Sequence, residues 1–167
     1  MLSNSRIAAY LHTDHMATIA QLQELEDLIR AKAAPVLTPQ LRQGLADLAA
    51  TLRREVEGHF GFEEDHVFPE FLKLGESGIV MMLTHEHRSI LPLASQTAAL
   101  AEAALAEGAF APQLWQEFRD TAAELVEREI FHIQKEEMGL LGAITHLLNE
   151  EIDSRLADAY VAKFGAA

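Results

Sequence analysis

The sequence predicts an all-α protein, an up-down-up-down four-helix bundle with a short C-terminal helix. Three observations lead to this prediction. Helix-forming residues, above all alanine, leucine, glutamate and glutamine, dominate the 167 residues. Glycines and prolines are few and widely spaced, so they divide the chain into four long segments with short connections. No segment shows the alternation of apolar and polar residues that indicates a β-strand.

Prolines and a capping threonine define the first two helices. The first helix is expected over about residues 5–32, because the chain cannot easily stay helical just before Pro35. Thr38, followed directly by proline, is typical of a helix N-cap with proline in the first turn. The second helix is therefore expected over about residues 39–74. Pro69 lies within it and should kink or break its last turn.

The second half of the chain repeats this arrangement. The third helix is expected over about residues 79–107, with a bend at Pro92. The fourth should begin at Pro112 and reach at least Met138, beyond which two glycines weaken the helical pattern. Asn149 can cap the short C-terminal helix, expected at about residues 150–164.

Composition limits the class of protein. We expect a single domain over residues 1–167, with the bundle at about 5–148. The net charge of −13 argues against nucleic acid or an anionic membrane as partner, because both attract basic surfaces. The absence of cysteine excludes disulfides, thiolate metal sites and cysteine nucleophiles. The chain has no apolar run of about 20 residues and no hydrophobic signal core, which favours a cytoplasmic protein.

An internal repeat contains most of the histidines. Each half of the sequence has an acidic residue followed by a histidine and, 44 or 45 residues later, the motif His-x-x-x-Glu-Glu. The first copy is Asp14-His15 with His59 and Glu63-Glu64, and the second is Glu86-His87 with His132 and Glu136-Glu137.

Helical geometry predicts that these residues meet. At about 100° per residue, each of the four histidines falls within the apolar stripe of its own helix. With a rise of 1.5 Å per residue, each lies about 27–30 Å from the loop that joins its helix to the next. Antiparallel packing therefore brings His15, His59, His87 and His132 into one layer. Glu63 and Glu136 follow one turn further along.

A buried layer of imidazoles and carboxylates predicts a bound cation. A single histidine of this kind is usually a core or surface residue, but unpaired buried carboxylates are strongly unfavourable. Imidazole and carboxylate suit iron, manganese or zinc, and two carboxylates can bridge two metal ions. A ferritin-like site is the alternative, since Glu129-x-x-His132 and Glu63-x-x-His66 fit its motif. The histidines at positions 15 and 87, where that site has glutamates, count against it.

The motifs together resemble those of the hemerythrin-like family, or HHE cation-binding domains, over about residues 8–141. The matching segments are Asp14-His15, His59-Phe-Gly-Phe-Glu63-Glu-x-x-x-Phe-Pro69, Glu86-His87 and His132-Ile-Gln-Lys-Glu136-Glu. The resemblance implies a four-helix bundle with a non-haem di-iron centre. In that centre Glu63 and Glu136 would bridge two iron ions together with an oxo or hydroxo group. The four histidines of the layer would cap the irons.

One position departs from the family pattern. Oxygen-carrying hemerythrins have a fifth histidine one turn before the ligand of the third helix, and here that position is Leu83. An extra ligand, or a group that bonds to a ligand, is therefore expected among His12, His66 and Glu64. Glu64 and Glu137 lie about 100° away from the bridging glutamates, which favours contact with a ligand or with solvent.

The function expected from this site is binding or sensing of a small diatomic molecule, oxygen or nitric oxide. The alternatives are a di-iron enzyme that reduces peroxide or nitric oxide or oxidises ferrous ion, an iron storage or donation protein, and a metal-free interaction module. Manganese or zinc could replace iron, because the same ligands serve them. The sequence assigns no catalytic residue. The oligomeric state stays open, although a closed bundle can exist as a monomer.

Overall fold

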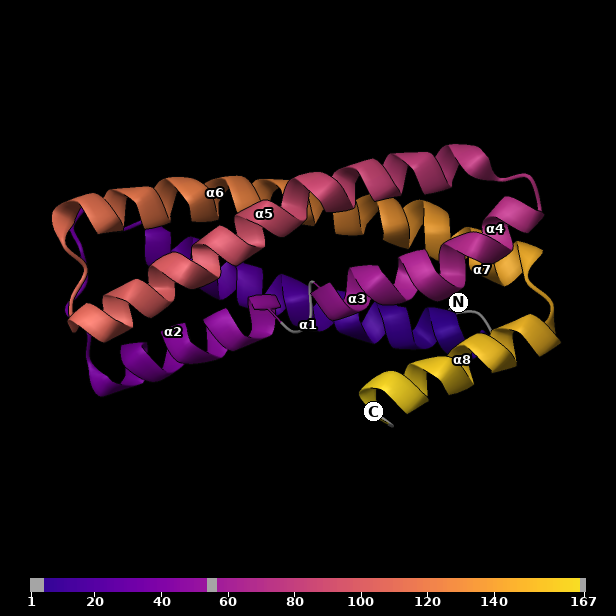
Figure 1. Cartoon of the computed structure of the whole chain (residues 1–167), viewed down its shortest axis with the longest axis horizontal. Coiled ribbons are helices and arrows are strands. Elements are labelled where there is room, and N and C mark those ends of the chain that lie inside the picture. The colour runs from indigo at the N-terminus through magenta and orange to yellow at the C-terminus, as the bar shows by residue number, and fades with distance from the viewer. Residues whose placement is uncertain (1–4, 54–56, 166–167) are drawn as a thin grey trace.

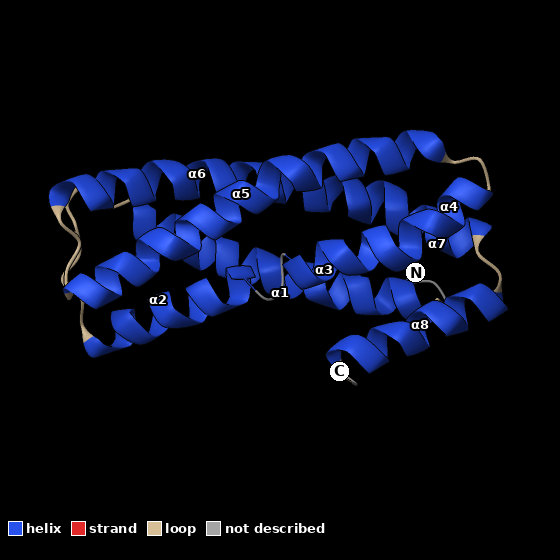
Figure 2. Ribbon diagram, in the orientation of Figure 1, coloured by secondary structure: helices blue, strands red, loops and turns tan. Residues whose placement is uncertain are grey.

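The protein is all-α, as predicted. The computed structural model describes residues 5–53 and 57–165, and no strand occurs among them. Figure 2 shows helices joined by short loops over nearly the whole of this part of the chain. The expected second helix, residues 39–74, includes positions 54–56, which lie outside the described residues.

The described helices run back and forth along one long axis. Their bounds are α1 Arg6–Ile29, α2 Pro39–Thr51, α3 Glu57–Phe62, α4 Phe68–Lys73, α5 Ser77–Glu107, α6 Pro112–Lys135, α7 Leu141–Leu147 and α8 Glu150–Phe164. Figure 1 shows the chain turning back at each end of the bundle, with α3 and α4 continuing in the direction of α2 and α7 continuing in the direction of α6. The short helix α8 then returns beside α1.

Two side-chain caps occur where the sequence predicts them. Thr38 Oγ1 accepts a hydrogen bond from the amide of Leu41 at 3.2 Å, and the side chain of Asn149 accepts one from Ile152 at 2.9 Å. Each satisfies a backbone N–H that the first helical turn leaves without a partner. These caps fix the starts of α2 and α8, while α1 ends three residues earlier than expected.

Among the described residues, π-helical turns at Glu63–Val67 and Glu136–Leu140 interrupt the α-helices. Because each turn joins two helical segments, α3 continues into α4 and α6 into α7 without a loop. The expected break at Pro69 does not occur. Pro69 follows the first π-turn and lies in the first turn of α4, where a missing amide hydrogen is tolerated. Likewise, α5 continues through Pro92.

The core consists of two apolar clusters with a polar layer between them. One cluster surrounds Phe118 and Leu22, and the other surrounds Phe62 and Leu11. Along α1, the buried His15 lies between Leu11 and Leu22, so it belongs to the layer that separates the clusters. This layer contains the candidate site.

Candidate metal centre

The structure brings the six residues of the predicted layer together. The histidines come from four helices, His15 from α1, His59 from α3, His87 from α5 and His132 from α6, and Glu63 and Glu136 begin the two π-turns. The side chain of His59 keeps 11% of its surface exposed, and the other five side chains are at most 2% exposed. The layer is therefore almost completely shielded from solvent.

These residues form two groups that share both glutamates. Within each group, one possible ligand atom from every residue lies within 4.8 Å of the others. One group is His15, His59, Glu63 and Glu136, and the other is Glu63, His87, His132 and Glu136. The layer thus offers two places for a cation, each with two imidazoles and two carboxylates.

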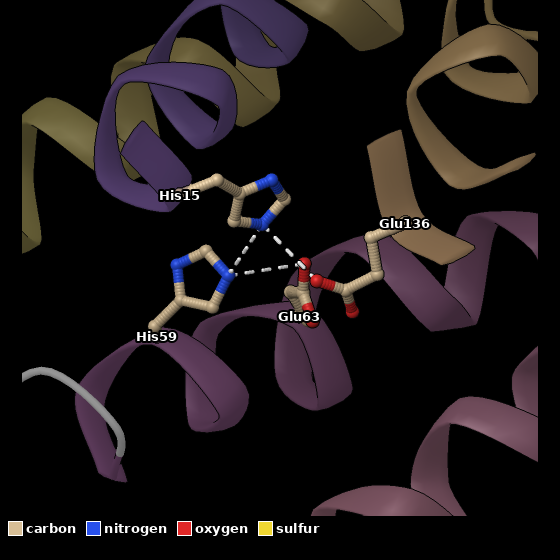
Figure 3. Close-up of side chains that lie close together, drawn as sticks. All are labelled: His15, His59, Glu63 and Glu136. Carbon is tan, nitrogen blue, oxygen red and sulfur yellow. Dashed lines mark hydrogen bonds and ion pairs between the residues drawn. The ribbon is translucent and has the colours of Figure 1, made fainter. Parts of the chain in front are cut away.

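Glu136 directs its two oxygens at different histidine pairs. Its Oε2 lies 3.0 Å from Nε2 of His15, and its Oε1 lies 3.0 Å from Nε2 of His132. Figure 3 shows the first of these contacts, with His15 and His59 facing the two glutamates. One carboxylate can therefore serve both groups at once.

Glu63 has the same divided contacts. Its Oε1 lies 3.4 Å from Nε2 of His59, and its Oε2 lies 3.3 Å from Nε2 of His87. Carboxylates with one oxygen on each of two neighbouring sites have the arrangement required to bridge two metal ions.

The outer nitrogen of each histidine meets a second set of carboxylates. The contacts to Nδ1 are Asp14 with His59 at 3.3 Å, Glu64 with His87 at 2.8 Å, Glu86 with His132 at 3.0 Å, and Glu137 with His15 at 2.6 Å. In every case the acid lies on one helical segment and the histidine on the next, and the fourth contact returns to α1. The four contacts form a closed ring around the bundle, which we call the acidic ring.

The acidic ring fixes the direction of the imidazoles. An ionised carboxylate only accepts hydrogen bonds, so Nδ1 of each histidine donates its proton outward. The inner Nε2 atoms are then the ones available to a metal ion. The four acids of the acidic ring are thus part of the same site as the inner histidines and glutamates.

The side chains expected as extra ligands lie outside the two groups. His12 Nδ1 contacts Oε2 of Glu137 at 2.9 Å, so it bonds to the acid that holds His15. Glu64 bonds to His87. His66 is exposed, with its ring 4.9 Å from that of Phe62. Leu83 is fully buried in the apolar cluster next to the site.

Several inner atoms have no hydrogen-bond partner within the described residues. They are both carboxylate oxygens of Glu63 and of Glu136, and Nε2 of His87 and of His132. Buried polar atoms normally have partners, and buried carboxylates without one are costly. They lie 3.0–3.7 Å from one another or from Nε2 of His15 and His59, so a cation between these atoms would give each of them a partner. The donor set therefore fits a metal ion.

Charge attraction dominates the protonation of the inner groups. Burial lowers the pKa of His87, but the nearby carboxylates of Glu136 and Glu63 outweigh it and raise the value to about 9. Burial raises the pKa of Glu136, but the histidines around it hold the value well below its usual range. Without a metal, the carboxylates are thus neutralised by protonated imidazoles, which a metal ion would have to displace.

Glu129 adds a third carboxyl group near the site. Its side chain lies on α6 one turn before His132, only 4% exposed, and its Oε2 has no hydrogen-bond partner among the described residues. Burial raises its pKa to about 7. Glu129 lines a cavity of about 10 Å³ together with His15 and His59, at the lower limit for one water molecule.

Sequence reasoning placed Glu129 only in the rejected ferritin-like motif and gave no role to Asp14 or Glu86. A signal for the two acids was present, since a residue next to an inward histidine lies about 100° away and faces the neighbouring helix. No comparable signal indicated Tyr160 of α8, whose hydroxyl contacts Asp14.

The fold and the site together define a helical-bundle protein with a metal-binding site. The sequence profile of the Hemerythrin HHE cation binding domain matches residues 6–144, so the chain belongs to this family. Comparison with curated proteins and with solved structures found no match. Within the described residues, no helix has the length and apolar character needed to cross a membrane.

Proposed function

We propose that the centre holds two iron ions and reversibly binds oxygen or nitric oxide. One ion would lie between His15 and His59, the other between His87 and His132, and Glu63 and Glu136 would bridge them. The observation that carries this proposal is that each glutamate directs one oxygen at each histidine pair. A single cation would leave one histidine pair and one oxygen of each glutamate without a partner.

The donor set supports iron. Two imidazoles and two carboxylate oxygens per ion suit a hard or borderline metal that accepts both nitrogen and oxygen. Manganese and zinc accept the same donors and are the alternatives. Four protein donors also leave coordination positions open for a bridging oxygen and for a small ligand.

The surroundings of the site favour a ligand of two or three atoms. The cavity beside His15 and His59 has room for about one water molecule. Phe60 also lines this cavity, and its ring stacks on His87 with centroids 3.8 Å apart and planes 6° apart, so it fills the space at His87. Close aromatic packing therefore leaves the cavity as the place where a diatomic molecule would be held.

Glu129 favours a second candidate function, reduction of the bound molecule. Peroxide or nitric oxide reduction consumes protons, and a buried carboxyl group in the same cavity could supply them. Replacing Glu129 with glutamine separates the two functions. Reversible binding would survive the change, whereas turnover that depends on this proton would fall.

Elemental analysis combined with anaerobic and aerobic visible spectra tests the proposal. We expect about two irons per chain, an absorption change when air is admitted, and its reversal under argon. The variant His132→Ala should lose iron, whereas His146→Ala, which removes an exposed histidine on α7, should retain it. Absence of stoichiometric metal after anaerobic reconstitution with ferrous ion would refute the proposal.

A further inference from the structure

The helix α8 lies beyond residues 6–144, which match the family profile, yet it is attached to the start of α1. Asp153 accepts hydrogen bonds from the amides of Arg6 at 2.9 Å and Ile7 at 3.3 Å, and from the hydroxyl of Ser5. From this point α8 runs beside α1 (Figure 1), and its residue Tyr160 reaches Asp14. The attachment brings the far end of α8 to the level of Asp14.

Tyr160 makes the second attachment. Its hydroxyl lies 2.7 Å from Oδ1 and 2.6 Å from Oδ2 of Asp14. The ring is 6% exposed, stacks on Tyr10 with centroids 4.9 Å apart, and meets the edge of Phe62 at 5.4 Å. The phenol is therefore held rigidly where it donates its hydrogen to the carboxylate of Asp14.

Asp14 is the member of the acidic ring that most needs such support. It is the only aspartate in the ring, and its contact with His59, 3.3 Å, is longer than the other three, which are 2.6–3.0 Å. Its side chain is 33% exposed, less than the 40% of Glu64, but enough for water to compete for its oxygens. Without a second partner, this carboxylate could turn away from His59.

We propose that α8 contributes to the metal centre through Tyr160. Tyr160 is a positioning residue that holds Asp14 against Nδ1 of His59. The contact thereby sets the direction of the inner Nε2 of His59 and the strength with which the cation between His15 and His59 is bound. This proposal rests on the proposed two-metal centre.

The proposal predicts an effect on one half of the centre only. Hydrogen-bond partners of metal-bound histidines change metal affinity by about 10–100-fold. Loss of the Tyr160 hydroxyl should weaken the cation beside His59 within this range. The cation between His87 and His132 should be unaffected, because Glu64 and Glu86 hold those histidines.

The test uses the full chain loaded with cobalt(II) in place of iron. Tyr160→Phe removes the hydroxyl and keeps the ring, and Tyr10→Phe is the matched control in the same aromatic stack. Calorimetric titration should show two cobalt sites in wild type and in Tyr10→Phe. In Tyr160→Phe, one of the two sites should bind cobalt at least tenfold more weakly. Proton NMR of the cobalt form should show faster solvent exchange of the His59 imidazole N–H alone.

Three results would overturn the proposal. Unchanged affinity and exchange in Tyr160→Phe would show that the hydroxyl does not support His59. Equal weakening of both sites, with a lower melting temperature of the metal-free chain, would show a packing role only. If wild type binds no pair of cations, the two-metal function itself is wrong, and this proposal fails with it.

Discussion

At the scale of single residues, the outer hydrogen bonds decide which nitrogen each histidine offers to the centre. An imidazole can present either nitrogen, and a carboxylate on Nδ1 selects Nε2. In this protein, each of the four Nδ1 atoms contacts a carboxylate from a neighbouring helical segment. The acids are therefore expected to affect metal affinity although they do not touch the metal.

Glu64 gives the simplest test, because its one described hydrogen bond goes to His87. We predict that Glu64→Ala lowers the affinity of one of the two metal sites about 10–100-fold. Glu64→Gln keeps an oxygen that can accept the hydrogen bond, so it should lose much less. Competition with a chelator measures both variants, and equal affinities for wild type and Glu64→Ala would contradict the prediction.

The buried Glu129 predicts that the stability of the metal-free protein depends on pH. Burial raises its pKa from 4.5 to about 7, so the folded chain keeps a proton that the unfolded chain loses. Its contribution to stability is therefore complete below about pH 4.5 and is lost as the pH rises through 7. The neutral variant Glu129→Gln avoids this loss. Between pH 5 and 8 it should gain roughly 3 kcal/mol relative to wild type.

Urea unfolding of metal-free wild type and metal-free Glu129→Gln at pH 5 and at pH 8 measures this difference. A constant difference between the variant and wild type across the range would show that Glu129 ionises normally. Glu124→Gln, which changes an exposed glutamate on the same helix, should leave the pH dependence unchanged.

At the scale of the elements, the sequence predicted the helices better than it predicted their irregular turns. Apolar stripes and caps indicated the helices because these features are local. The π-turns at Glu63 and Glu136 were not predicted, because no residue type marks the point where a helical turn widens to i→i+5 bonding. Pro69 was expected to kink or break the last turn of its helix, and the structure shows no break there.

The candidate site, too, was predicted only in part from the sequence. The four histidines and two glutamates could be placed in one layer from the helical repeat and the loop positions alone. The partners of Nδ1, and the contact from Tyr160, depend on the rotation of neighbouring helices about their axes and on where α8 packs. These are tertiary features that residue spacing within one helix does not contain.

Attachment of α8 to the start of α1 depends on Asp153. Asp153→Ala would leave the amides of Arg6 and Ile7 without their side-chain acceptor. We predict a loss of about 1–3 kcal/mol in the free energy of unfolding. Asp158→Ala, which breaks an exposed ion pair with Arg6, should leave the free energy of unfolding nearly unchanged. Denaturant unfolding compares the two, and equal losses would contradict the role of Asp153.

At the scale of the whole molecule, the two halves of the sequence contribute equivalent parts to a single centre. Each half supplies two histidines, one of the two shared glutamates and two acids of the ring. Every helical segment in the layer is tied to the next by one acid–histidine contact. The bundle and the centre are therefore expected to be stabilised together, and metal removal should loosen the entire layer.

This coupling predicts how metal-dependent stability varies with pH. Without metal, the carboxylates near His87 raise its pKa from 6.5 to about 9. That ion pairing contributes fully to stability below about pH 6.5 and is lost as the pH rises through 9. A bound cation replaces these protons, so metal affinity should rise with pH and binding should release protons.

The metal-free chain should therefore lose stability between pH 6 and 9, while the metal-loaded chain retains it. At a free metal concentration about 100 times the dissociation constant, binding adds about 2.7 kcal/mol. As that constant falls with rising pH, the gap between the two melting temperatures should widen. Thermal unfolding with and without metal at pH 6, 7.5 and 9 measures the gap. A gap that narrows with pH would mean that the metal does not displace protons from these histidines.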